Sequence, residues 1–217
     1  MDEVEKIRSY KDRIRIFLIL YFFSEDFLEP NKPLLKKVFR SEMRIQKIDF
    51  LVRNPDYLAF ELLNIVRKDE LKKEEIKHVV KNIFQNNEPV LRRLEMERFF
   101  FGAYEDIDDV ISFLKSIGFI DFSSKKSSDL KTVDKLYFIT DLAVNKMGIN
   151  ISSLPALTWY VDRCTLIKKY FGDMSATQLK VAQYQIDEYR DTSYKSYIGS
   201  IKGLVVEEFN NIYNEQL

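Results

Sequence analysis

The side chains that most often perform nucleophilic or acid–base chemistry are scarce in this chain. Its 217 residues include one histidine, His78, and one cysteine, Cys164. A serine or cysteine nucleophile needs a neighbouring base, and His78 is the only imidazole that could act as one. Glu75 and His78 have the Glu-x-x-His spacing found in di-metal bundles, but such a site needs the motif twice. We therefore interpret His78 as a surface residue and Cys164 as a core residue.

The densest group of carboxylates is formed by Glu105, Asp106, Asp108 and Asp109. Oxygen ligands of this kind could hold a divalent cation. The same acids stand at the expected start of a helix, where capping and the helix dipole favour them, and we prefer this simpler explanation. Neither glycine-rich phosphate-binding motif occurs. The sequence thus predicts no catalytic residue, no metal site, no cofactor, and a protein that is not an enzyme.

Positive charge is concentrated between residues 36 and 53, where basic residues outnumber acidic ones by four. If this region is helical, Arg40, Arg44 and Lys47 share one face, at a spacing suited to phosphates or to an acidic protein partner. An ordinary solvated helix face is the alternative. The candidate contact residues here are Lys36, Lys37, Arg40, Arg44 and Lys47.

Three lysines in an expected hairpin tip, Lys125, Lys126 and Lys131, are further candidates for the same kind of contact. The helix expected just before that hairpin has four acidic residues at its start and only Lys115 against them. A helix with this charge repels phosphate, so it is not expected to enter the DNA major groove. Any DNA contact should be indirect or non-specific.

The elements that must position these residues begin with a layer of helices. Apolar residues at helical spacing form a stripe along residues 14–22, and the most apolar run, 16–23, is too short to span a bilayer. A second helical region is expected around 34–39, and Ser41 is expected to cap a third helix. Pro55 begins the next helix, and the charged stretch 67–77 indicates a solvated helix or linker.

The pattern changes at Leu91. Residues 94–101 are predicted to form a strand that enters a core, and 106–117 a helix ended by Gly118. The β-prone runs 119–122 and 136–139 enclose a polar stretch typical of a hairpin tip. Helix, strand, long turn, strand and helix in this order indicate a winged-helix segment.

Helical spacing returns beyond Pro155. The predicted fold is mostly α with a small β-wing, of the α+β class, in which a winged-helix domain packs with N- and C-terminal helices. The expected segments are 1–90, an N-terminal helical layer, 91–150, the winged-helix-like segment, and 151–217, the C-terminal helices, together one compact unit. Since successive strand residues point to opposite faces, at least one residue of Phe99–Phe101 should face this second helical layer.

Composition limits the partners and the compartment. The 34 Lys+Arg balance the 34 Asp+Glu, so overall charge suggests neither nucleic acid nor a membrane surface. One cysteine cannot form an intramolecular disulfide and fits a reducing compartment. No secretory signal or transmembrane run is recognisable. We therefore predict a cytoplasmic protein with no membrane association.

Three stretches resemble a family of small bacterial helical and winged-helix proteins. They are 44–55 (RIQKIDFLVRNP), 99–102 (FFFG) with the helix that ends in 117–120 (IGFI), and 136–140 (LYFIT) before Gly148. In these stretches the chain is similar to the middle components of ABC-three-component defence systems, of which Lamassu is the best-known type. The resemblance covers residues 10–190. The chain keeps the glycine but lacks the proline of the family's Tyr-Gly-Pro turn.

The resemblance implies a non-catalytic adaptor in an anti-phage or anti-plasmid defence complex. Such an adaptor docks to an SMC-like ATPase that senses foreign DNA and couples it to an effector nuclease. Two alternatives stay open. The Lys47–Phe50 stretch and the Phe-Gly turn also resemble antitoxin domains that neutralise a toxin by direct binding, and the basic residues would suit a winged-helix regulator that binds DNA.

An adaptor without a catalytic site must bind through an apolar surface rimmed by charge. Tyrosine suits such a surface because it tolerates water before docking and burial afterwards. The candidates near the C-terminus are Tyr189, Tyr194, Tyr197, Phe209 and Tyr213. If they form the interface, deletion of residues 193–217 weakens assembly and leaves the winged helix folded. The alternative is that the last helix closes the protein's own core.

Overall fold

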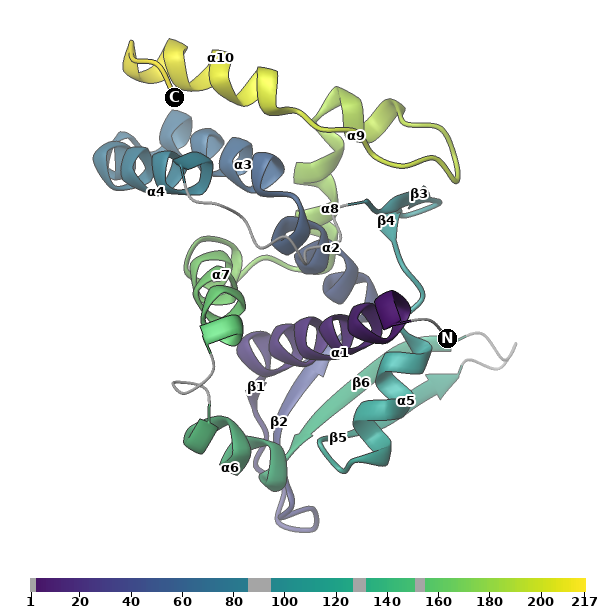
Figure 1. Cartoon of the computed structure of the whole chain (residues 1–217). Helices are drawn as coiled ribbons and strands as arrows, with labels where there is room; N and C mark the ends of the chain where they lie inside the picture. Colours follow the sequence, from purple (N-terminus) through teal and green to yellow (C-terminus); the bar gives the residue numbers. More distant parts are fainter. Residues whose placement is uncertain (1–2, 86–94, 127–131, 151–154) are drawn as a thin grey trace. The chain divides into compact units, whose positions relative to one another are not determined.

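The computed structural model describes residues 3–85, 95–126, 132–150 and 155–217 (Figure 1). The chain is mostly helical with a small four-stranded antiparallel sheet, which confirms the predicted α+β class. Its contacts divide it into two compact units, each built from two segments. Unit 1 comprises Met1–Asp49 and Glu105–Ala176, and unit 2 comprises Phe50–Tyr104 and Thr177–Leu217.

The boundaries of these units differ from the expected divisions at residues 90 and 150. Neither unit is a continuous stretch of sequence. The chain leaves unit 1 within the helix Glu42–Arg53, forms residues 50–104 of unit 2, returns to unit 1 for residues 105–176, and ends in unit 2. The expectation that the whole chain forms one compact unit stays a prediction.

Unit 1 contains the four-stranded sheet, whose strand order is β1–β2–β6–β5 with every neighbouring pair antiparallel. Its strands are β1 (Glu25–Asp26), β2 (Leu35–Arg40), β5 (Ile120–Lys126) and β6 (Thr132–Thr140). Helix α1 (Glu3–Phe23) packs against β2 and β6 and also contacts α5 (Asp108–Ser116) and α7 (Pro155–Phe171), while α6 (Asp141–Asn150) contacts the same two strands. Residues 16–20 of α1 are all buried, because helices and sheet enclose α1 on more than one side.

The predicted hairpin is confirmed in its described part. Helix α5 ends in a Schellman motif, in which the amide of Gly118 donates to Lys115 O and that of Phe119 donates to Leu114 O. Gly118 has φ +74°, a left-handed conformation that favours glycine. The chain then enters β5, and Ile120 lies opposite Ile139 of β6.

The helix predicted around residues 34–39 is wrong, because this segment is strand β2. Val38 lies opposite Phe138 in the ladder with β6. Only seven residues separate Pro33 from Ser41, too few for a stable helix, and pairing with β6 satisfies the backbone. Ser41, with φ +76°, then turns the chain, and α2 (Glu42–Arg53) begins directly after it, as expected.

Unit 2 is built on α3 (Pro55–Lys68), which contacts both α4 (Lys73–Gln85) and α10 (Lys202–Tyr213) (Figure 1). The start of α3 at Pro55 is confirmed. The charged stretch after it forms the short 3₁₀ helix η1 (Glu70–Lys72) and the start of α4. The remaining elements of this unit are α8 (Ala176–Tyr184), which begins at its boundary, α9 (Asp187–Asp191), β3 (Glu97–Phe99) and β4 (Gly102–Tyr104).

A cluster of buried rings holds unit 2 together. Phe50 contacts Tyr57 and Tyr189, with ring centres 4.7 Å and 5.0 Å away. Tyr57 Oη donates to Gly199 O over 3.0 Å, and Asp56 Oδ2 accepts from Ile201 N over 2.8 Å. These bonds fix the segment before α10 to the start of α3.

The strand predicted over residues 94–101 is shorter than expected and does not end in the core. Only Glu97–Phe99 form β3, which pairs with β4, and Phe100 and Phe101 form the exposed turn between them. Gly102, with φ +96°, allows this tight reversal. Phe99 is half-buried against the rings of Tyr104 and Tyr194.

Candidate protein-interaction surface

The side chains considered for catalysis or metal binding lie on separate segments of the chain. Within the part of the chain that the structure describes, no three His, Cys, Asp or Glu residues are grouped as metal ligands. His78 is exposed on α4, and Cys164 is buried in α7, where burial raises the pKa of its thiol to about 12. Asp106 Oδ1 accepts a hydrogen bond from Asp108 N, a local turn at the start of α5.

The basic residues predicted to share one helical face do not do so. Lys36, Lys37 and Arg40 lie on β2, where successive side chains point to opposite faces. Lys36 pairs with Asp141 and Lys37 with Asp26. Arg44 is half-buried on α2, and Lys47 is buried at 1% exposure, so Lys47 cannot contact a partner from the surface.

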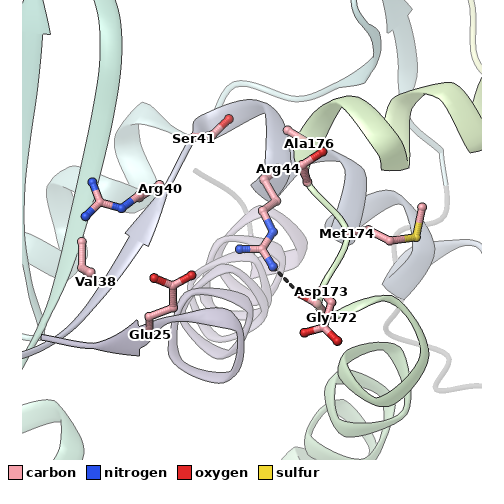
Figure 2. Close-up of a pocket in the computed structure, with 10 residues that line it drawn as sticks. Glu25, Val38, Arg40, Ser41, Arg44, Gly172, Asp173, Met174 and Ala176 are labelled. Atoms are coloured by element: carbon pink, nitrogen blue, oxygen red, sulfur yellow. Dashed lines mark hydrogen bonds between the residues drawn. The ribbon is translucent and has the colours of Figure 1, made fainter.

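Arg40 and Arg44 line a pocket of about 430 Å³ in unit 1. Figure 2 shows Arg44 extending from α2 toward the turn after α7, where its Nη2 donates to Gly172 O over 2.5 Å, while Arg40 points in a different direction. Burial lowers the pKa of Arg44, and the carboxylates of Glu25 and Asp173 partly oppose this effect. Because both carboxylates line the same pocket, an approaching phosphate would meet repulsion as well as attraction.

The lysines of the predicted wing are only partly described. The backbones of Lys125 and Lys126 belong to the end of β5, opposite Asp134 and Thr132. Lys131 lies outside the described residues. Contact between these three lysines and nucleic acid or an acidic partner therefore stays a prediction.

The five aromatic residues proposed as a C-terminal interface separate into two groups. Tyr189 and Phe209 are fully buried in unit 2, so the prediction that they contact a partner is wrong. Tyr213 is half-buried, and its Oη donates to Lys73 O over 2.8 Å. Tyr194 and Tyr197 are exposed, as an interface requires.

Two further exposed rings, Phe100 and Phe101, lie in the hairpin whose backbone is bonded to the segment that carries Tyr194 and Tyr197. Phe100 is 77% exposed and Phe101 66%, compared with 46% for Tyr194 and 55% for Tyr197. The ring centres of Phe100 and Tyr194 are 4.8 Å apart. We call Phe100, Phe101, Tyr194 and Tyr197 the aromatic surface.

Backbone hydrogen bonds fix the two segments that carry the aromatic surface. Arg98 N donates to Ser196 O over 2.9 Å, and Lys195 N donates to Arg98 O over 2.8 Å. Glu97 and Tyr197 also form an isolated antiparallel β-bridge. On the other side of the hairpin, Ala103 N donates to Tyr189 Oη over 2.7 Å. The rings are therefore presented by a braced hairpin.

One signal for the exposed phenylalanines was present in the sequence. Three phenylalanines followed by Gly102 indicate a strand that reverses at the glycine. A reversal there places Phe100 and Phe101 at a loop tip, where surrounding chain cannot cover both rings. Tyr194 and Tyr197 were already candidates by residue type, but their proximity to this turn depends on pairing between segments about a hundred residues apart, which no local pattern predicts.

Comparison with known proteins adds no relationship: no family model matches the chain, and neither a curated protein nor a solved structure does so. Among the described helices, none combines the length and the apolar character that a bilayer crossing requires.

Proposed function

We propose that this chain is a non-catalytic adaptor subunit that holds a partner protein through the aromatic surface. The observation that carries this proposal is the exposure of four aromatic rings on a braced hairpin and the adjoining segment. Burying one such ring at an interface contributes about 2 kcal/mol, so a partner that covers all four rings would gain considerable binding free energy. Interfaces are enriched in such residues, and a few of them dominate affinity.

The resemblance to middle components of ABC-three-component systems supplies the proposed partners. They are an SMC-like ATPase and an effector nuclease of an anti-phage or anti-plasmid complex. The adaptor would dock to the ATPase and couple it to the effector. This role requires binding surfaces and no catalytic group.

The connectivity of unit 1 supports a winged-helix identity. Helix α1, strand β2 and helix α2 are followed, after the excursion into unit 2, by helix α5 and strands β5 and β6. Strand β6 lies between β2 and β5. This order of elements and this sheet order support our proposal that unit 1 is a winged helix, in which α5 would take the position of the DNA-reading helix.

The charge of α5 favours a protein partner over DNA for this winged helix. Asp106, Asp108 and Asp109 are all exposed at its start. Three carboxylates at the end that would approach the duplex repel its phosphates. Winged helices serve many functions, so the fold alone does not require DNA binding.

Co-expression with the neighbouring genes tests the proposal. The tagged full-length chain should copurify stoichiometrically with an ATPase that has a coiled-coil insertion, and with the effector. Retention of a small toxin without any ATPase would favour the antitoxin alternative, in which the chain also acts by direct protein binding. Purification of the chain alone from this co-expression would contradict the adaptor function.

A further inference from the structure

Three cations lie beside the aromatic surface and its supporting rings. Lys180 Nζ is 5.1 Å from the ring centre of Phe101, and Lys195 Nζ is 5.7 Å from that of Tyr194. The guanidinium carbon of Arg98 is 5.7 Å from the ring centre of Tyr184. None of the three forms an ion pair with a residue that the structure describes, and Arg98 Nε is buried without a hydrogen-bond partner.

The acidic residues of the neighbouring helix α9 are engaged elsewhere. Asp191 accepts two hydrogen bonds of 2.8 Å from Arg190, and Asp187 pairs with the same arginine. Glu188 Oε1 accepts from Gly199 N over 3.0 Å. Lys180 and Lys195 thus have no carboxylate partner among the described residues, whereas Arg98 adds to the effect of Arg190 in lowering the pKa of Asp191.

The charge balance around these cations distinguishes a protein partner from single-stranded nucleic acid. The two segments of unit 2 that build this surface, 95–104 and 177–201, contain five acidic and four basic residues. Binding of a phosphate backbone needs a broad positive potential, which a slightly acidic region does not provide. A few cations placed directly beside rings suit a few carboxylates placed directly beside an apolar anchor.

We propose that the aromatic surface binds an acidic peptide segment of the partner, in which an aromatic or aliphatic side chain is flanked by Asp or Glu. The anchor would pack on Phe100 and Phe101, while the flanking carboxylates face Lys180 and Lys195. This inference rests on the proposed adaptor function and specifies the chemistry of the segment that is held.

Selection from a displayed library of random dodecapeptides on the immobilised full-length chain tests this preference. The Phe100→Ser/Phe101→Ser variant is used to remove peptides that bind elsewhere. Selected peptides should contain an aromatic or aliphatic residue with Asp or Glu on both sides. No enrichment, or enrichment without an acidic preference, would overturn the inference.

Binding of the most enriched peptide is then measured for charge variants. Lys180→Glu/Lys195→Glu should weaken binding about tenfold or more, as expected for the loss and reversal of two charge pairs. Lys72→Glu/Lys202→Glu makes the same charge change at exposed positions outside the surface and should leave binding unchanged. Equal affinity for all three proteins would overturn the inference, as would tighter binding of an oligodeoxythymidine that depends on Phe100 and Phe101.

The outcome is separable from that of the proposed function. If the selected peptides show no acidic preference but the ATPase copurifies, the peptide preference is wrong and the adaptor function still holds. Acidic peptides that bind the surface, without any copurifying ATPase, would remove the adaptor assignment and leave the peptide preference.

Discussion

Burial gives the tyrosines of unit 2 two different roles. Tyr57 and Tyr189 are fully buried, and their hydroxyls bond to Gly199 O and Ala103 N. Tyr194 and Tyr197 are half-exposed to solvent on the adjoining segment. The buried pair fixes the backbone that presents the exposed pair, so loss of a buried hydroxyl should affect stability and loss of an exposed ring should affect binding.

Tyr189→Phe tests the buried role. Removal of the hydroxyl deletes the buried hydrogen bond that Ala103 N donates to it, which should lower the free energy of unfolding by about 1 kcal/mol. The measurement is urea denaturation. Copurification with the partner should be unchanged below the unfolding transition, and loss of assembly without loss of stability would contradict this role.

Glu61 of α3 should make stability depend on pH. Burial raises the pKa of its carboxyl to about 7, while a hydrogen bond from Asn64 and the charge of Lys68 partly oppose this, and Oε1 has no hydrogen-bond partner. The folded state therefore holds the proton more tightly than the unfolded state. This contribution to stability is fully present below the unfolded value of 4.5 and is lost as the pH rises through about 7.

Glu61→Gln should remove this dependence. The unfolding free energy of the wild type, relative to the variant, should fall by about 3 kcal/mol between about pH 4 and pH 8. Urea titrations of both proteins across this range provide the measurement. Parallel pH profiles would show that Glu61 keeps an ordinary pKa.

At the scale of elements, α1 and α2 are joined by a buried ion pair. Arg15 Nε donates to Asp49 Oδ1 over 2.5 Å, and both side chains are at most 3% exposed. Burial alone would lower the pKa of Arg15, but Asp49 and Asp12 outweigh it and raise the pKa above its usual value. Asp49→Asn removes one of the negative charges that stabilise the buried guanidinium of Arg15.

The Asp49→Asn variant should lose about 3 kcal/mol of unfolding free energy in urea, because removing one charge of a buried pair strands the other. Asp12→Asn is the matched control, since Asp12 bonds to the same guanidinium but is more exposed. It should lose clearly less. Equal losses would contradict the dominance of the Arg15–Asp49 pair.

Deletion of residues 193–217 tests whether α10 belongs to the core of unit 2. The deletion removes the bonds that Ser200 Oγ and Ile201 N donate to the buried Asp56, together with the buried rings of α10. We expect circular dichroism to show a loss of helix larger than the deleted residues account for. A loss that matches α10 alone would restore the alternative that this segment is a detachable interface.

Local signals predicted some elements and missed others for physical reasons. Gly118 after an apolar helix specified the end of α5 and the start of the hairpin, because few residues other than glycine adopt that conformation. Residues 34–39 carry apolar residues at positions compatible with either helix or strand. Their pairing with β6, about a hundred residues later, decides between the two.

The site was predictable only in part. Tyr194 and Tyr197 were predicted as interface residues from residue type. The contact of Tyr194 with Phe100 depends on pairing between distant segments, which the sequence alone does not predict. Tyr189 and Phe209 have the same residue types but opposite burial. Residue type sets the capacity to bind, while the fold of unit 2 decides which rings remain available.

At the scale of the whole molecule, the two units have separate tasks in the proposed function. Unit 1 contains the four-stranded antiparallel sheet and the exposed carboxylates at the start of α5, and unit 2 contains the aromatic surface. If assembly depends on the aromatic surface, its loss should abolish partner binding while the fold of both units persists.

Copurification of the Phe100→Ser/Phe101→Ser variant with the co-expressed ATPase and effector tests this claim most directly. Both phenylalanines are exposed, so the variant should unfold within about 0.5 kcal/mol of the wild type. Leu28→Ser/Leu71→Ser, which changes two highly exposed leucines elsewhere, is the control and should assemble normally. We predict that the phenylalanine variant retains less than about a tenth of the wild-type amount of partner. Retention equal to the leucine control would contradict the account.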